Sequence, residues 1–181
     1  GMDRTWSCFD CQFDGAEPVC FTAAGAFDPH RLARMLLKVN ASDVSPEHKA
    51  DRMRAYDCVD EMVQAAPEAA VQFILAALDE CQTGADVGLL GAGALETLLK
   101  ANGPQVIGTL EAAACKHAKM RYLLSATWGQ SSIAPGVWAR LVAAVAPGPV
   151  MDADARTPAA GREDKVLDAA GLAALLSKPM D

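Results

Sequence analysis

The chain has 181 residues, of which 51% are hydrophobic and only 6% aromatic, and its formal net charge at pH 7 is −7. That length suits a single domain, and the apolar fraction is sufficient for a buried core. A core poor in aromatic residues favours packed helices over a β-sandwich or barrel. The negative charge argues against nucleic acid as a ligand, because a phosphate-binding surface needs clustered Lys and Arg.

The sequence shows neither an export signal nor a membrane span. Its start, Met2 to Trp6, has no apolar run of the kind found in signal peptides. No apolar stretch approaches the roughly 20 residues that a membrane-spanning helix needs. We therefore expect a cytoplasmic protein that is not bound to membranes, and we expect its six cysteines to stay reduced.

Residues 1–27 are the least regular part of the sequence. Apolar and polar residues nearly alternate from Phe9 to Phe13, which is consistent with a short strand or with an irregular arm across helices. Helices are predicted from Asp28 onward, because Asp followed by proline is typical of a helix start. A second helix is predicted from Pro46 to Ala65. Its inward stripe is predicted to contain Met53, Tyr56, Val59, Met62 and Val63.

Proline and glycine divide the centre of the chain into further helices. Pro67 opens a third helix, because proline cannot continue the preceding one. A short helical piece near residues 86–90 leads to Gly91-Ala92-Gly93, where we expect a break that permits a tight turn or a close contact between two backbones. Asn102-Gly103-Pro104 is predicted to end a fourth helix and to start a fifth. Two more helices are predicted over residues 119–128 and 135–145.

The composition changes after residue 146. Residues 147–162 are rich in proline and glycine, as linkers are. An amphipathic helix is predicted within residues 163–181, beginning near Glu163 and carrying Val166, Leu167 and Leu176. We expect this helix to dock, either on its own domain or on a neighbouring subunit. The predicted organisation is therefore an arm at 1–27, a helical domain at 28–146, a linker at 147–162 and a docking helix at 163–181.

Two segments of the helical domain resemble each other. Residues 70–78 can be laid over residues 106–114, and each segment follows a helix start marked by proline. Their separation of about 36 residues is near the period of two-helix solenoid repeats. The predicted fold is therefore all-α, with stacked antiparallel helical hairpins in a short HEAT-like solenoid. Trp128 and Trp138 are expected to hold the last hairpin together, whereas an exposed Trp there would indicate a partner surface.

Several short motifs lie along these helices. They are Pro67-Glu68-Ala69-Ala70, Ala92-Gly93-Ala94-Leu95-Glu96-Thr97-Leu98-Leu99, Asn102-Gly103, Trp128 and Val137-Trp138-Ala139-Arg140. Together they resemble a family of bacterial domains of unknown function, over residues 55–142. Ala94 stands where that family usually has proline, and Asn102 where it often has histidine. The resemblance implies a helical fold and brings no activity or site residue with it.

The N-terminal arm contains the clearest candidate for metal chemistry. Cys8 and Cys11 are separated by two residues, and Cys20 and His30 follow. Two thiolates at that spacing can share a tetrahedral Zn²⁺, and a third cysteine with a histidine would complete the site. The alternative is that the cysteines are small buried apolar residues. Zinc is thus a hypothesis for the arm, and no other cofactor is expected.

Acidic residues give weaker indications of chemistry. Asp57, Asp60 and Glu61 share one face of the second helix. We interpret that face as solvated, because no other helix supplies the Glu-x-x-His motif that di-metal bundles use. Glu96 is expected to cap the start of its own helix and to pair with Lys100. A pocket near Gly91–Glu96 is the alternative, and it would make the protein a small-molecule binder or an enzyme.

No set of residues in the sequence forms a complete catalytic site, and stacked helical hairpins provide extended binding surfaces. We therefore predict a non-catalytic protein-binding or adaptor module that forms a homo-oligomer. A basic protein partner suits the acidic chain. The two alternatives are a small zinc-stabilised protein and a protein with a ligand pocket near Gly91–Glu96.

Overall fold

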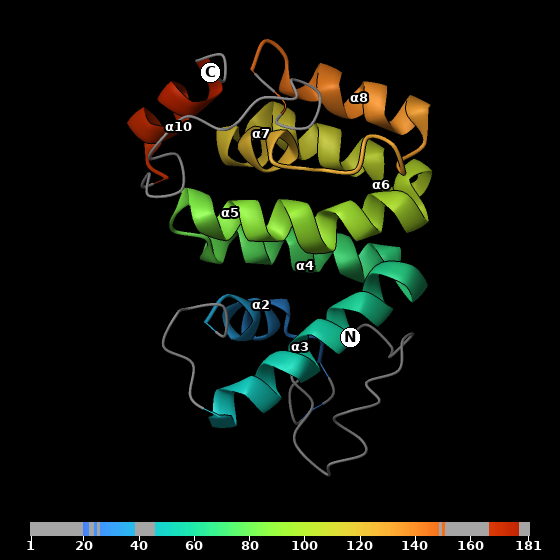
Figure 1. Cartoon of the computed structure of the whole chain (residues 1–181), viewed down its shortest axis with the longest axis vertical. Coiled ribbons are helices and arrows are strands. Elements are labelled where there is room, and N and C mark those ends of the chain that lie inside the picture. The colour runs from blue at the N-terminus through green and yellow to red at the C-terminus, as the bar shows by residue number, and fades with distance from the viewer. Residues whose placement is uncertain are drawn as a thin grey trace. The chain divides into compact units, whose positions relative to one another are not determined.

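A computed structural model of the chain describes residues 20, 21, 24, 26–38, 46–148, 150 and 167–177. Its helices, in chain order, are α2 (Pro29–Lys38), α3 (Pro46–Ala65), α4 (Pro67–Glu80), α5 (Gly84–Leu90), the π-helical turn η1 (Gly91–Leu95), α6 (Glu96–Lys116), α7 (Ala118–Ser125), α8 (Pro135–Val145) and α10 (Ala169–Ser177) (Figure 1). The predicted all-α class is confirmed for these residues. They divide into two compact units, residues 1–80 and 81–181, and each unit is described by itself.

Helices α2, α3 and α4 build the first unit. The start of α2 is as predicted, because the Asp28 Oδ1 atom accepts a hydrogen bond from the Arg31 backbone N–H at 3.1 Å. Helix α4 contacts both α2 and α3. The large buried side chains of this unit are Leu32, Leu36, Val59, Met62, Val63, Phe73 and Ile74. Their removal from water is the main force that holds the three helices together.

The described residues before α2 lie against the first unit. The Asp28 backbone N–H donates to the Cys20 carbonyl oxygen at 2.9 Å. Phe21 and Phe27 form an isolated antiparallel bridge, with ring centroids 5.9 Å apart. Cys20 and Phe21 are fully buried. Cys20, Phe21 and Phe27 thus pack within the first unit, whereas most of the predicted arm at 1–27 lies outside the described residues.

The second unit begins with α5 and its continuation. A capping box starts α5, in which the Asp86 backbone N–H donates to Thr83 Oγ1 at 3.4 Å and Asp86 Oδ2 accepts from the Thr83 N–H at 3.3 Å. The break predicted at Gly91-Ala92-Gly93 is wrong, because the helix continues through η1 directly into α6. A close contact of two backbones does occur at Gly91, where a Cβ atom would lie 2.8 Å from the Ala126 carbonyl oxygen. Glycine is therefore required at position 91 for packing and not for a turn.

Helix α6 joins the two helices that were predicted on either side of Asn102-Gly103-Pro104. Asn102 has φ −139° and ψ 29°, outside the helical region, so the two predicted helices meet at a kink where they were expected to divide. Pro104 cannot donate the backbone hydrogen bond of a continuous helix, which accounts for the bend. Gly103 sits against α8, since a Cβ atom there would lie 3.1 Å from Val137 Cγ1.

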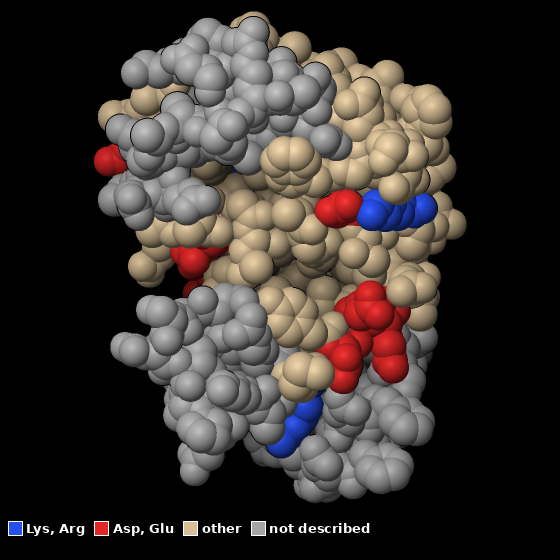
Figure 2. Space-filling model, viewed as in Figure 1, with Lys and Arg blue, Asp and Glu red and all other residues tan. Residues whose placement is uncertain are grey.

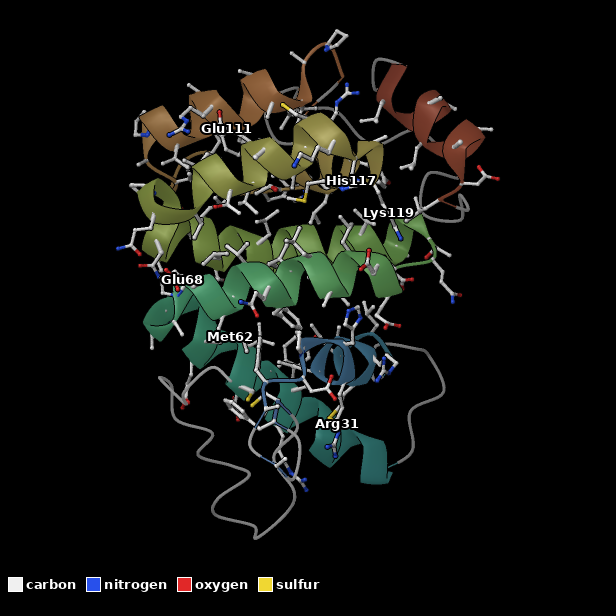
Figure 3. All side chains as sticks on the ribbon, turned by 180° about the vertical axis from the view of Figure 1, so that it is seen from behind. Arg31, Met62, Glu68, Glu111, His117 and Lys119 are labelled. Carbon is white, nitrogen blue, oxygen red and sulfur yellow. The ribbon has the colours of Figure 1, made fainter. Side chains whose placement is uncertain are left out.

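Helices α7 and α8 complete the core of the second unit. Helix α6 contacts both of them, and they contact each other. His117, labelled in Figure 3, is the junction between α6 and α7 and has extended backbone angles. The Lys119 ammonium donates to the Cys81 carbonyl oxygen at 2.7 Å, which ties α7 to the residue that begins this unit. Trp138 is buried on α8, as expected for a residue that holds the last hairpin.

Helix α10 begins at Ala169, and the predicted helix start near residue 163 lies outside the described residues. Asp168 is its N-cap, because Asp168 Oδ1 accepts from the Gly171 backbone N–H at 2.7 Å. Leu167 precedes the helix and donates its backbone N–H to the Gln82 carbonyl oxygen at 3.3 Å. Helix α10 contacts α7, and its Leu172 and Leu176 side chains are buried. These contacts favour docking on its own unit, which stays a prediction, and residues 151–166 lie outside the described part.

Contacts between consecutive helices, α3 with α4 and α6 with α7, are those that helical hairpins would make. The HEAT-like stacking of such hairpins and the predicted domain boundaries stay predictions. None of the described helices has both the length and the apolar character needed to cross a bilayer.

Candidate functional site

Helix α3 separates its residues into two faces. The inner face repeats every three or four residues and consists of Ala55, Cys58, Val59, Met62 and Val63, all buried. Met62, labelled in Figure 3, has no exposed surface. This stripe holds α3 against the other helices of the first unit.

Two members of the predicted inward stripe lie outside it: Met53 is on the opposite side of the helix, and Tyr56 is at the edge of the inner face, about 20° from Val63. Met53 is 60% exposed and Tyr56 is 37% exposed, so the first half of that prediction is wrong. The inner face runs back from Met62 through the small residues Cys58 and Ala55 instead. A helical stripe defined only by large apolar residues does not include Cys58 and Ala55. Cys and Ala are nevertheless buried as often as larger apolar residues are.

The exposed side chains of α3 form a continuous face. Successive residues of an α-helix are about 100° apart, so Met53, Tyr56, Asp57, Asp60 and Gln64 fall within an arc of about 100°. All five are exposed. We call these five residues the α3 outer face. Figure 2 shows acidic side chains gathered over α3 on the visible side of the first unit.

The α3 outer face has the composition of a binding surface. Tyr and Met are enriched at the centre of protein interfaces, where Tyr offers a rigid ring with a polar end and Met adapts to irregular surfaces. Asp57 and Asp60 add negative charge beside them. Among the described residues, no group of three His, Cys, Asp or Glu side chains could hold a metal ion. The α3 outer face therefore combines two apolar side chains with two carboxylates on one side of the helix.

Glu96 has a structural role different from the predicted one. Its side chain is 18% exposed and pairs with Lys100 Nζ at 2.8 Å, so the predicted ion pair is confirmed. The predicted capping of its own helix start is wrong, because the Glu96 backbone N–H bonds to the Gly93 carbonyl within a continuous helix. The carboxylate also lies against Gly129, whose φ is +107°. A Cβ atom on Gly129 would be 2.8 Å from Glu96 Oε1.

The neighbourhood of Gly91–Glu96 is a packing contact. The Ala126 backbone lies against Gly91, and Leu95 is fully buried. Gly93 is exposed, with no atom within 4 Å of the place where its Cβ would be. The contact with Ala126 explains Gly91 without a ligand, and these observations add no support to the predicted pocket.

The candidate zinc ligands are only partly within the described residues. Cys8 and Cys11 lie outside them. The Cys20 Sγ atom is 3.0 Å from the Sγ atom of Cys58, and both residues are buried. His30 Nδ1 is 3.2 Å from Glu80 Oε1, an oxygen that also accepts from Arg34 at 3.1 Å. Zinc in the arm stays a prediction.

Cys58 is the chemically interesting residue that the sequence reasoning missed. It lies 38 residues from Cys20. No spacing rule for cysteine motifs joins residues so far apart, so only the packing of α3 against the segment before α2 brings the two sulfur atoms together.

Trp128 on the second unit is an exposed aromatic side chain. It is 37% exposed, whereas Trp138 is buried. Trp138 therefore does what was expected of both residues, and Trp128 meets the condition stated for a partner surface. Among the described residues, Met53, Tyr56 and Trp128 are the large hydrophobic side chains that are exposed.

Residues 42–148 match a family described as Family of unknown function (DUF6869). The match bears out the resemblance to a family of unknown function and includes α3 as well as the motifs that carried the resemblance. Searches of curated proteins and of solved structures gave no match.

Proposed function

This chain belongs to the DUF6869 family, whose function is unknown, and we propose that it is a non-catalytic protein-binding module that acts through the α3 outer face. The observation that carries the proposal is the exposure of Met53 and Tyr56 beside Asp57 and Asp60 on one side of a helix. Helix α3 lies within the residues that match the family. The surface therefore belongs to the family domain.

The apolar part of this face supplies the binding energy. Met53 and Tyr56 are three residues apart, so they are neighbours on the helix surface. Covering apolar surface contributes about 25 cal/mol for each Å² removed from water. A single exposed apolar side chain is ordinary on a protein surface, but an exposed Met next to an exposed Tyr forms an anchor of the kind that dominates binding energy.

The charged part of the face determines the kind of partner. Asp57 and Asp60 lie on either side of the line that joins Met53 to Gln64, and the whole chain carries a net charge of −7. Negative potential attracts a basic partner and accelerates its association. The partner that fits is a protein segment with an apolar side for Met53 and Tyr56 and flanking Lys or Arg for the carboxylates. An amphipathic basic helix has this pattern.

The experiment uses the full chain and a set of synthetic helical peptides. Each peptide has one apolar side and flanking Lys and Arg, and each is matched with the same peptide carrying Glu in place of Lys and Arg. Binding is measured by fluorescence anisotropy. We expect the basic peptides to bind and the acidic peptides to fail, because the same apolar side meets opposite charges.

Two variants place the binding on α3. Met53→Ala combined with Tyr56→Ala should reduce the affinity for the basic peptides at least tenfold, since each truncation at an anchor removes more than about 1 kcal/mol. The matched control is Gln72→Ala, an exposed position on α4 of the same unit, which should bind as the wild type does. Equal binding by the double variant, or equal binding of basic and acidic peptides, would contradict the proposal.

A further inference from the structure

Two buried thiols touch in the first unit. The Sγ atoms of Cys20 and Cys58 are 3.0 Å apart, and the two residues are 0% and 3% exposed. A disulfide bond is about 2.0 Å long. The two sulfur atoms therefore need to approach by roughly one further ångström to bond.

The backbone on each side fixes this approach. Cys58 lies on the inner face of α3, between the buried Ala55 and Met62. Cys20 is held by the hydrogen bond from the Asp28 N–H to its carbonyl oxygen, at the start of α2. Cys58 is thus held by a helix and Cys20 by a backbone hydrogen bond, within the same unit.

Two other described cysteines provide a contrast. Cys115 is an exposed thiol at the end of α6, and Cys81 is a buried thiol at the start of the second unit. Exposure alone would make Cys115 the first to react with an oxidant. Proximity instead determines the product at Cys20 and Cys58, because a sulfenic acid formed on one sulfur can be attacked by the other to give a disulfide.

We propose that Cys20 and Cys58 form a reversible disulfide in response to hydrogen peroxide. The thiolate of one cysteine attacks a peroxide oxygen, the O–O bond breaks, and the hydroxide that leaves takes a proton to become water. The resulting sulfenic acid is attacked by the sulfur of the second cysteine, and its S–O bond breaks to release a second water. Two thiols are oxidised to one disulfide, and one peroxide is reduced to two waters. A dithiol reverses the reaction by thiol–disulfide exchange.

The disulfide would connect the segment before α2 to the middle of α3, across 38 residues of sequence. Closing a loop of that length removes conformations from the unfolded chain and so stabilises the first unit. The proposal concerns the thiol pair alone and does not depend on whether the α3 outer face binds a partner.

The test uses the full chain, reduced and treated with a chelator, and then exposed to a small excess of hydrogen peroxide. Remaining thiols are alkylated, and the digested protein is mapped by mass spectrometry without reduction. We expect a linked pair of peptides containing Cys20 and Cys58, in addition to any oxidation at the exposed Cys115. We also expect the Tm to rise by several degrees and to return on addition of a dithiol.

Three variants decide the outcome. Cys20→Ser and Cys58→Ser should each abolish the linked peptides and the rise in Tm, whereas the matched control Cys81→Ser, also a buried cysteine, should keep both. Circular dichroism of the reduced variants checks that they are folded. Linkage of Cys20 to Cys8 or Cys11 in the wild type would overturn the proposal. Stoichiometric zinc in protein purified without chelator, lost on Cys58→Ser, would also overturn it and would assign the pair to a metal site.

Discussion

At position 91 the space around the residue determines which amino acid is allowed. A Cβ atom there would lie 2.8 Å from the carbonyl oxygen of Ala126 and 3.1 Å from its Cβ. The contact joins η1 to the end of α7 within the second unit. Because one partner is backbone, the clash cannot be relieved by a change of side-chain rotamer.

We expect Gly91→Val to destabilise the protein by about 1–3 kcal/mol or more, as overpacking of a closely packed site does. Urea unfolding of the purified protein measures the free energy of unfolding. Gly93→Ala is the control, because nothing lies within 4 Å of the place for its Cβ. It should be neutral or stabilising by up to about 1 kcal/mol, since Ala restricts the unfolded chain more than Gly does. Equal effects of the two changes would show that the contact with Ala126 is unimportant.

At the scale of the element, helix α3 has a methionine on its buried face and another on its exposed face. Met62 is fully buried and Met53 is 60% exposed. Replacing Met62 by Ala should lower the free energy of unfolding by about 2–5 kcal/mol, because it leaves a cavity in the first unit. Replacing Met53 by Ala should change it by less than about 0.5 kcal/mol. Thermal unfolding of both variants compares their stabilities directly. A large loss of stability in Met53→Ala would support the predicted inward position of Met53.

Helix α10 offers a second comparison between neighbouring positions. Leu172 is buried and Ala173 is exposed. Leu172→Asp should detach α10 from α7, because it places a charge in an apolar contact, while Ala173→Asp should leave the helix bound. Limited proteolysis measures the difference. Cleavage after residue 146 should be faster in Leu172→Asp and unchanged in Ala173→Asp. If both variants resist cleavage equally and keep their mass in solution, the predicted docking of this helix is wrong.

At the scale of the whole molecule, the net charge of −7 should appear in the salt dependence of binding. The screening length falls from about 10 Å at 0.1 M salt to about 3 Å at 1 M. We therefore expect the affinity for the basic peptides to fall as salt rises, and to fall less for the double variant Asp57→Asn with Asp60→Asn. The control is Glu68→Gln with Asp79→Asn, which removes the same charge from exposed positions of α4. If the α3 double variant and the α4 double variant show the same salt dependence, the peptides are attracted by the net charge of the chain and not by the carboxylates of the α3 outer face.

Helix boundaries were the most predictable feature of this protein. Proline at positions 46, 67 and 135 coincides with the starts of α3, α4 and α8. Proline fits the first turn of a helix and is disfavoured in the helix interior. Boundaries predicted from glycine were less reliable. The glycines at 91 and 93 do not break the helix, because a glycine can serve a close contact as well as a turn.

The sequence by itself determined the all-α class, the starts of the proline-led helices, the Glu96–Lys100 ion pair and the membership of a family of unknown function. The first three follow from composition, from proline positions and from residues three or four apart, and the family follows from the resemblance of the motifs to that family. Only the tertiary structure decided which side of α3 is exposed and which cysteine lies beside Cys20. Both depend on contacts between residues far apart in the chain. Local patterns alone do not distinguish the two faces of α3 or the possible partners of Cys20.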